Sequence, residues 1–100
     1  MKPTGRQRQL LEQMGRIERM ERGALCRMAG RRHYNHQTWQ GGRNVVRYVP
    51  AWERAALQQA LAGYQRFRRL AEQYADEVIR QTRRARAKLA PTPPAARKRR

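Results

Sequence analysis

Apolar residues near the start of the chain fall at the spacing of an amphipathic helix. From Leu10 to Met20 they recur mostly at intervals of three or four residues, which places them on one helical stripe. Upstream, Thr4 followed three residues later by Gln7 fits the capping box that opens many helices. The sequence therefore predicts a first helix from about Gly5 to Glu21.

A β-hairpin is predicted between His33 and Val49. Two runs rich in aromatic and β-branched residues flank Gly41 and Gly42, which are typical of a hairpin turn. A short run before them, from Ala24 to Met28, is bounded by glycines and suits an edge strand. With the two glycines in the loop, the residues expected to face one another are Trp39 and Asn44, Thr38 and Val45, His36 and Arg47, and Tyr34 and Val49.

The same pattern leaves open which side of the hairpin is buried. One face would carry Tyr34, Thr38, Val45 and Val49, together with His36 and Arg47. The other face would carry Trp39, Val46 and Tyr48, together with Asn35 and Gln37. Neither face is cleanly apolar, so the alternation does not select the buried one.

Pro50 ends the second of these strands, and a long helical pattern begins near Trp52. Continued to Leu89, this helix would have about 38 residues and a length of about 57 Å. Because a protein of 100 residues has about half that diameter, we expect the last third of the helix to project beyond the body or to break. Its apolar seam follows heptad spacing until polar Gln81 and consists of Leu57, Ala60, Tyr64, Phe67, Ala71, Tyr74 and Val78.

These elements predict an α+β fold with an N-terminal helix, a small antiparallel hairpin or three-stranded sheet, and a long C-terminal helix with a basic tail. Residues 1–90 are expected to form a single small domain. Residues 91–100 hold three prolines and four basic residues, which predicts a disordered tail.

The charge of the chain changes the picture most. There are 24 Lys and Arg against 7 Asp and Glu, a net charge of +17, while Leu, Ile, Val and Phe together number only 14. From Arg80 onward there are nine basic residues and no acidic one. A thin folded body with a concentrated positive charge indicates a polyanionic partner.

Several classes of protein are disfavoured. No stretch approaches the roughly 18 consecutive apolar residues of a membrane-spanning helix, and the first ten residues hold no apolar signal region. A single cysteine, Cys26, allows no internal disulfide. We therefore expect a cytoplasmic protein in a reducing compartment, with the bacterial nucleoid as one setting.

A metal site and a catalytic site are both disfavoured. Cys26, His33 and His36 lack a fourth ligand, and the two histidines are expected to point to opposite faces of a strand. Glu72 and Asp76 lie four residues apart and could hold a divalent cation. We favour a solvated helix face instead, with exposed pairs to Arg68, Arg69 and Arg80. The sequence therefore predicts no enzyme, no catalytic residue, no metal and no cofactor.

Two motifs carry a resemblance to a known family. The segment Arg47-Tyr48-Val49-Pro50, followed after thirteen residues by the segment from Tyr64 to Glu72, resembles an uncharacterised family of small bacterial proteins often encoded near insertion-sequence transposases. The resemblance covers about Gly23 to Glu77. It implies a leading helix, a small β-ribbon, a long C-terminal helix and a link to mobile DNA, and it brings no catalytic residues. The cysteine cluster of many similar sequences is missing, since only Cys26 remains in that region.

The remaining hypothesis is nucleic-acid binding, mainly through phosphate contacts. One surface is the hairpin, where arginines interleave with aromatic rings that could stack on bases, although at least Tyr34 or Tyr48 is expected to pack inward. The other is the distal helix and tail. The candidate residues are Arg31, Arg32, Arg43, Arg47, Arg80, Arg83, Arg84, Arg86, Lys88, Arg97, Lys98, Arg99 and Arg100.

Two other functions stay open. The long helix could be a protein-interaction module that pairs with a second copy or with a transposase-like partner. Its interface would then be formed by Leu57, Tyr64, Phe67, Ala71, Tyr74 and Val78. A basic tail serves RNA as well as DNA, so the third reading is an RNA- or ribosome-associated protein. An anionic membrane is disfavoured, because the distal helix lacks a bulky apolar face.

Overall fold

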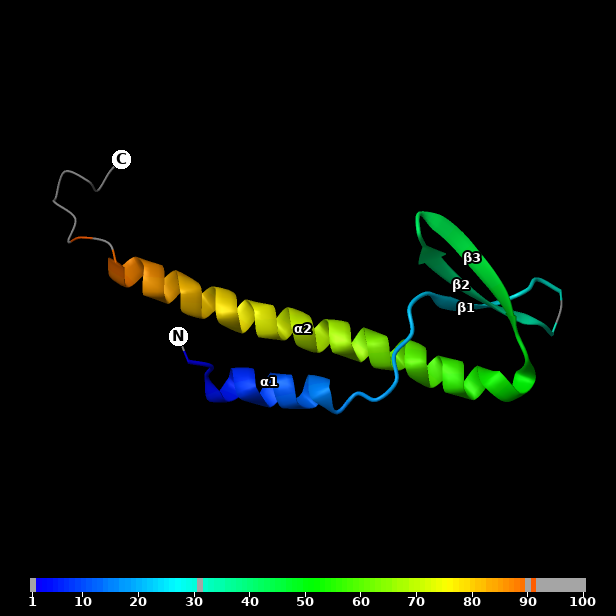
Figure 1. Ribbon diagram of the computed structural model, residues 1–100, viewed down its shortest axis with the longest axis horizontal. Helices are drawn as coiled ribbons and strands as arrows, with labels where there is room; N and C mark the ends of the chain where they lie inside the picture. The colour runs from blue at the N-terminus through cyan, green and yellow to red at the C-terminus, as the bar shows by residue number, and fades with distance from the viewer. Residues whose placement is uncertain (1, 31, 90, 92–100) are drawn as a thin grey trace.

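A computed structural model describes residues 2–30, 32–89 and 91 of the chain (Figure 1). The element order is α1 (Gly5–Gly15), β1 (Ala24–Arg27), β2 (Tyr34–Gln40), β3 (Arg43–Val49), a 3-10 turn η1 (Ala51–Glu53) and α2 (Arg54–Leu89). The predicted α+β fold, with a leading helix, a small antiparallel sheet and a long final helix, is confirmed. Apart from Pro91, the predicted tail lies outside the described residues.

The first helix begins where its capping box predicts. The Thr4 hydroxyl accepts a hydrogen bond from the Gln7 backbone at 3.1 Å, and the Gln7 side chain accepts one from the Thr4 backbone at 3.1 Å. Helix α1 ends at Gly15, however, and the prediction that it continues to Glu21 is wrong. The residues after Gly15 cross α2 in non-helical conformation, and the Glu21 backbone N–H donates to the Ala60 carbonyl at 2.9 Å.

Helix α1 lies antiparallel to the middle of α2 (Figure 1). Leu10 on α1 is fully buried and Leu70 on α2 is 5% exposed, so each helix of this pair contributes one buried leucine. Gln7 is also buried, and its Nε2 donates to Gln81 Oε1 at 2.9 Å. The polar residue that interrupts the predicted seam therefore continues the helix contact through a hydrogen bond.

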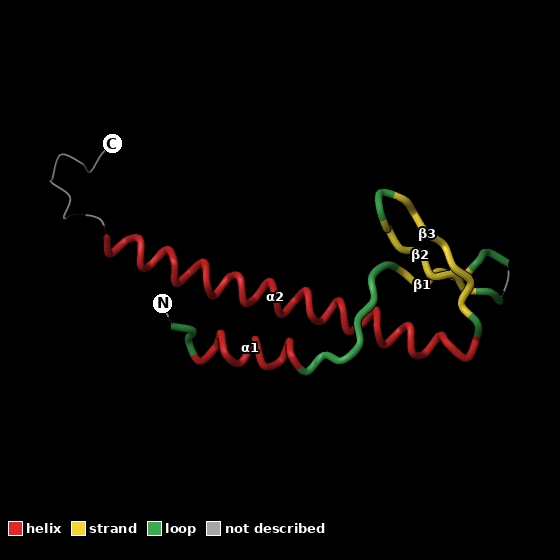
Figure 2. Tube along the Cα trace, viewed as in Figure 1, coloured by secondary structure: helices red, strands yellow, loops and turns green. Residues whose placement is uncertain are grey.

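The three strands form an antiparallel sheet in the order β1-β2-β3 (Figure 2). The register joins Tyr34 to Val49 at one end of the hairpin and Gln40 to Arg43 at the other, and all four predicted cross-strand pairs are present. Gly41 and Gly42 have φ of +56° and +78°, the left-handed conformation that a two-residue hairpin turn requires. Alternation and turn chemistry were thus sufficient to predict the register.

The structure decides which face of the sheet is buried. Thr38 and Val49 are 4% and 3% exposed, whereas Trp39 and Tyr48 on the other face are 71% and 57% exposed. On the buried side, the Arg54 guanidinium at the start of α2 lies 4.2 Å from the centre of the Tyr34 ring. The inner face is thus the one that the first turn of α2 contacts.

Helix α2 runs unbroken for 36 residues, a length of about 54 Å. Its first turns lie beside the sheet and its middle beside α1, and its last turns reach past the start of α1 (Figure 1). The principal extents of 70 × 32 × 23 Å describe an elongated molecule. The helix therefore does not break, and its last third is partly covered, because Gln81 bonds to Gln7 and to the Lys2 carbonyl. Within the described part of the chain, no helix combines the length and the apolar character needed to cross a membrane.

Candidate nucleic-acid interface

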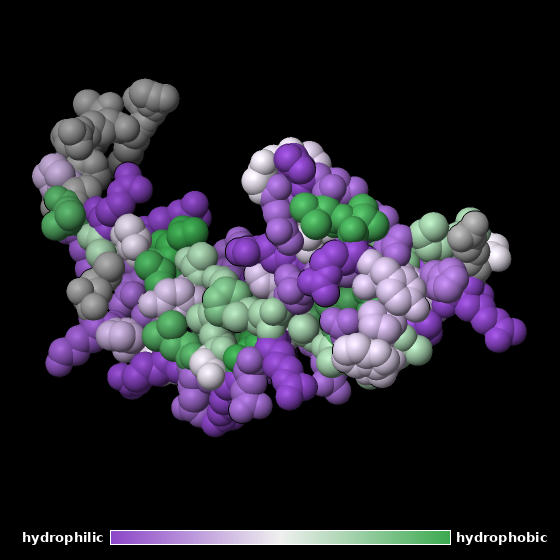
Figure 3. All heavy atoms as spheres, turned by 45° about the vertical axis from the view of Figure 1, so that its right-hand side comes forward, coloured by the Kyte–Doolittle hydropathy of each residue, from purple (hydrophilic) through white to green (hydrophobic). Residues whose placement is uncertain are grey.

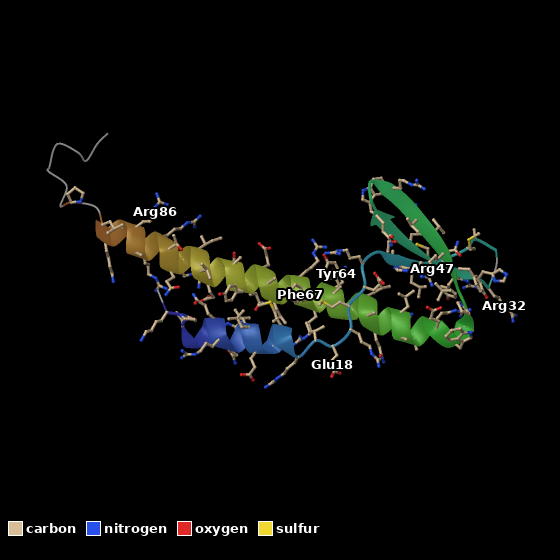
Figure 4. The ribbon with its side chains drawn as sticks, viewed as in Figure 1. Glu18, Arg32, Arg47, Tyr64, Phe67 and Arg86 are labelled. Carbon is tan, nitrogen blue, oxygen red and sulfur yellow. The ribbon has the colours of Figure 1, made fainter. Side chains whose placement is uncertain are left out.

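The last turns of α2 present a cluster of exposed basic side chains. We call this cluster the distal arginine group, and it consists of Arg80, Arg83, Arg84, Arg86 and Lys88. Arg80 donates to Glu77 Oε2 at 2.5 Å, and the sequence holds no acidic residue after Glu77. In Figure 4, Arg86 points away from the side of α2 that α1 covers. Most of the positive charge at this end of the molecule is therefore not neutralised by a neighbouring carboxylate of the helix.

The basic side chains border two shallow hollows. One hollow, of about 380 Å³, runs along α2 between Asp76 and Ala87, with Arg80 and Arg83 among its lining residues. The other lies where the start of α1 approaches α2, and Thr4, Gln81, Arg84, Ala85 and Lys88 line it. Arginine and lysine stems thus frame open grooves in which their charged ends remain in water.

The sheet carries the second group of candidate cations. Arg43 and Arg47 are exposed on β3, which is an edge strand, and Arg32 is exposed in the connection between β1 and β2. The Arg32 carbonyl accepts a hydrogen bond from Arg54 Nη2 at 3.2 Å, which ties this connection to α2. Arg31 and residues 97–100, which were also predicted to bind nucleic acid, lie outside the described residues.

The two groups lie at opposite ends of α2. From Arg54, beside the sheet, to Arg80 the helix rises by about 39 Å. The tertiary structure therefore does not bring the predicted basic residues into one patch. A single ligand would have to be long to contact both groups.

The aromatic residues of the hairpin divide between the two faces of the sheet. Tyr34 is half-buried under Arg54, so the expectation that at least one tyrosine packs inward is met by Tyr34. Tyr48 and Trp39 are exposed on the other face. The edge of the His33 ring meets Tyr48, with ring centres 5.7 Å apart and an interplanar angle of 67°. The rings available to a ligand are therefore those of Trp39 and Tyr48.

The six residues predicted as a helix interface are all half-buried within this chain. Figure 4 shows Phe67 pointing toward α1 and Tyr64 toward the crossing segment and the sheet. The most buried residue of α2 is Leu70, which the heptad seam leaves out. By helical phase, Leu57 and Tyr64 lie about 140° and 120° around α2 from Leu70, so the heptad seam and the most buried position are on different sides of the helix.

Tyr64 is held by the segment that crosses α2. Arg22 Nε donates to the Tyr64 hydroxyl at 3.2 Å, and its guanidinium lies 5.1 Å from the ring centre. This hydrogen bond, followed by the charge interaction with Tyr64, raises the pKa of Arg22 above its ordinary value. Arg22 thus joins the crossing segment to the helix through the Tyr64 hydroxyl and ring.

The residues weighed for metal or catalytic chemistry stay apart. His36 Nε2 bonds to the Arg22 carbonyl at 2.7 Å, whereas His33, which precedes β2, contacts Tyr48 on the other face of the sheet. Glu72 and Asp76 are exposed on α2, and the ion pair of Arg80 is with Glu77. Among the residues that the structure describes, no three His, Cys, Asp or Glu side chains gather as a metal ion would require.

One feature of the sheet was missed by reasoning from the sequence. No Asp or Glu occurs between Glu21 and Glu53, so all three strands and both of their connections are free of negative charge. The signal was available as a second acid-free run of the sequence. Its importance emerges only when this run folds into one sheet.

The fold and the two cationic surfaces define a small α+β protein with an elongated, strongly basic surface. A comparison of the chain with known protein families, curated proteins and solved structures finds no match.

Proposed function

We propose that this protein is a non-enzymatic nucleic-acid-binding accessory protein that holds its ligand mainly through phosphate contacts. The observation that carries the proposal is the distal arginine group, an exposed cluster of cations in the last turns of α2 that has, among the described residues, one carboxylate partner, Glu77. The resemblance to proteins encoded near transposases supports a link to mobile DNA.

The phosphate backbone of a nucleic acid complements this cationic surface better than the surface of a protein of ordinary charge does. Double-stranded DNA carries one negative charge per about 1.7 Å of its axis. Cations in a row along a protein helix can therefore each contact a phosphate at many positions along the duplex. The planar guanidinium also matches two phosphate oxygens at once. Four of the five members of the distal arginine group are arginines.

The salt dependence of binding tests the proposal. If the eight described candidate cations each neutralise one phosphate, the slope of log K against log salt on duplex DNA is about −7. Fluorescence anisotropy of labelled DNA and RNA, as duplexes and single strands, at several salt concentrations measures this slope. A salt-independent affinity, or no binding to any of these probes, contradicts the proposal. Preferential binding of RNA would favour the RNA-associated reading.

A protein-interaction module remains the second candidate, and one observation favours it. By helical phase, Ala75, Val78 and Ile79 continue the side of α2 that carries Leu57 and Tyr64. Ile79 is 44% exposed. A second copy could pack there. Sedimentation of the wild type and of Ile79→Glu tests this function, and a monomer in both cases excludes self-association through this side of α2.

A further inference from the structure

The outward face of the sheet is an uncharged surface with exposed rings. The cross-strand register places only neutral residues on this face: Ala24, Cys26, Asn35, Gln37, Trp39, Asn44, Val46 and Tyr48. Trp39, Val46 and Tyr48 are 71%, 49% and 57% exposed. The described chain therefore leaves two large rings in water where polar residues would ordinarily lie.

The rim of this face is positively charged. Arg43 stands at the hairpin turn, Arg32 lies at the opposite end of the sheet, and Arg47 lies on the β3 edge strand. Arg43 and Arg47 belong by register to the inner face, but long side chains on an edge strand can reach a ligand that lies along that edge. Because the whole sheet lacks acidic residues, nothing in it repels a phosphate backbone.

The two rings are spaced for a chain of bases. Trp39 stands opposite Asn44 and Tyr48 opposite Asn35, so the backbone positions that carry the two rings are four residues apart along the sheet, or about 13 Å. Gln37 and Val46 lie between them. An aromatic ring stacks on the face of any base, and amide groups such as that of Gln37 bond to base edges.

We infer that this outward face binds single-stranded nucleic acid, with Trp39 and Tyr48 stacking on unpaired bases and the rim arginines contacting the phosphates. The inference rests on the proposed function and names the ligand class for the sheet end of the molecule. A duplex cannot use these rings, because its bases are already stacked on one another. The rim arginines and the distal arginine group, in contrast, can hold the phosphates of either form.

Binding of matched single-stranded and duplex probes tests this inference. At one salt concentration, the wild type should bind a mixed-sequence single strand more tightly than the duplex of the same sequence. Trp39→Ala and Tyr48→Ala should each weaken single-strand binding by roughly 5- to 150-fold and leave duplex binding within about twofold. Trp39→Tyr keeps a stacking ring and should retain most of the affinity. DNA and RNA strands, used in parallel, show which sugar the face accepts.

Trp52 supplies the matched control. It is 84% exposed but lies in η1, outside the sheet, so Trp52→Phe should bind as the wild type does. Because the chain has two tryptophans, this variant also leaves Trp39 as the sole tryptophan. Its fluorescence should be quenched when a single strand binds and should not change with a duplex.

The outcomes separate this inference from the proposed function. Salt-dependent binding in which Trp39→Ala and Tyr48→Ala match the wild type, or an unquenched Trp39, overturns the stacking face and leaves the phosphate-binding function standing. The absence of salt-dependent binding to every probe overturns both. The quenching measurement uses a protein with an intact sheet face, so it decides the question even if an alanine variant fails to fold.

Discussion

At the scale of single residues, Gln7 shows how a polar side chain can stabilise a protein with a thin core. It is 3% exposed, yet both ends of its amide are paired: Oε1 accepts from the Thr4 backbone, and Nε2 donates to Gln81. Gln81 in turn donates to the Lys2 carbonyl at 3.3 Å. One side chain thus caps α1 and joins it to α2.

Gln7→Ala should therefore destabilise the protein more than a surface substitution does. The change leaves the Thr4 N–H and the Gln81 Oε1 without the hydrogen bond that Gln7 provides, which should lower the free energy of unfolding by about 1–3 kcal/mol. Urea denaturation followed by circular dichroism measures the change. Gln9→Ala is the matched control, because Gln9 is exposed and, among the described residues, its side chain accepts a hydrogen bond from Arg6 of its own helix. Equal losses in the two variants would contradict this role of Gln7.

At the scale of elements, the architecture depends on the crossing between the segment after α1 and helix α2. Gly63 lies at the crossing, where a Cβ would overlap the Arg19 carbonyl oxygen and come within 3.3 Å of the Ile17 side chain. The obstacle is backbone, which cannot move aside as a flexible side chain could. A glycine normally costs stability inside a long helix. At position 63 it is explained by the close approach of the Arg19 backbone, which leaves no room for a Cβ.

Gly63→Ala should lower the free energy of unfolding by about 1–3 kcal/mol, although alanine is the better helix former. Gly15→Ala offers the comparison, because Gly15 is also helical and has nothing within 4 Å of the added Cβ. That variant should gain about 0.4–1 kcal/mol. Thermal and urea denaturation of both proteins should give opposite signs. A stabilised Gly63→Ala protein would show that the crossing is not close-packed.

The distal arginine group belongs to α2, and its contribution can be separated from that of net charge. Replacing Arg83, Arg84 and Arg86 by Gln should reduce the steepness of the salt dependence on duplex DNA by about 3. The control replaces three exposed arginines of α1 and the crossing segment, Arg8, Arg16 and Arg19, by Gln and removes the same charge. If both triple variants change the slope equally, binding follows total charge and not this group.

At the scale of the whole molecule, the long helix acts as a spacer. The sheet and the distal arginine group are separated by about 39 Å of α2, and the molecule is more than twice as long as it is wide. Figure 3 shows hydrophilic side chains over much of one side of this elongated body, with apolar side chains between them. The two cationic ends can therefore act on one ligand only if that ligand is long.

Affinity for duplex DNA should accordingly increase with probe length and then level off. At 3.4 Å per base pair, about 12 base pairs span the distance between the two ends. Anisotropy measurements with duplexes of 6 to about 24 base pairs should show a marked gain near that length. The triple variant that lacks Arg83, Arg84 and Arg86 should lose the gain while still binding short probes. A smooth increase in both proteins would contradict binding at two ends.

The sequence by itself determined what depends on near neighbours. The capping box of Thr4 and Gln7, the turn at Gly41 and Gly42, the strand register and the long helix all follow from local patterns, and all are present in the structure. Each of these features involves contacts between residues close in the chain or fixed by one turn. Local physical chemistry is sufficient for them.

Only the tertiary structure decided the end of α1, the burial of Leu70 and the face of the sheet that remains exposed. The apolar periodicity continues through Ile17 and Met20, but the backbone there crosses α2 and bonds to Ala60. Likewise, both faces of the hairpin have mixed polarity, and the contact of Arg54 with Tyr34 selects the inner one. These outcomes depend on segments distant in the sequence, whose relative positions no local pattern specifies. The same contacts leave Trp39 and Tyr48 facing water.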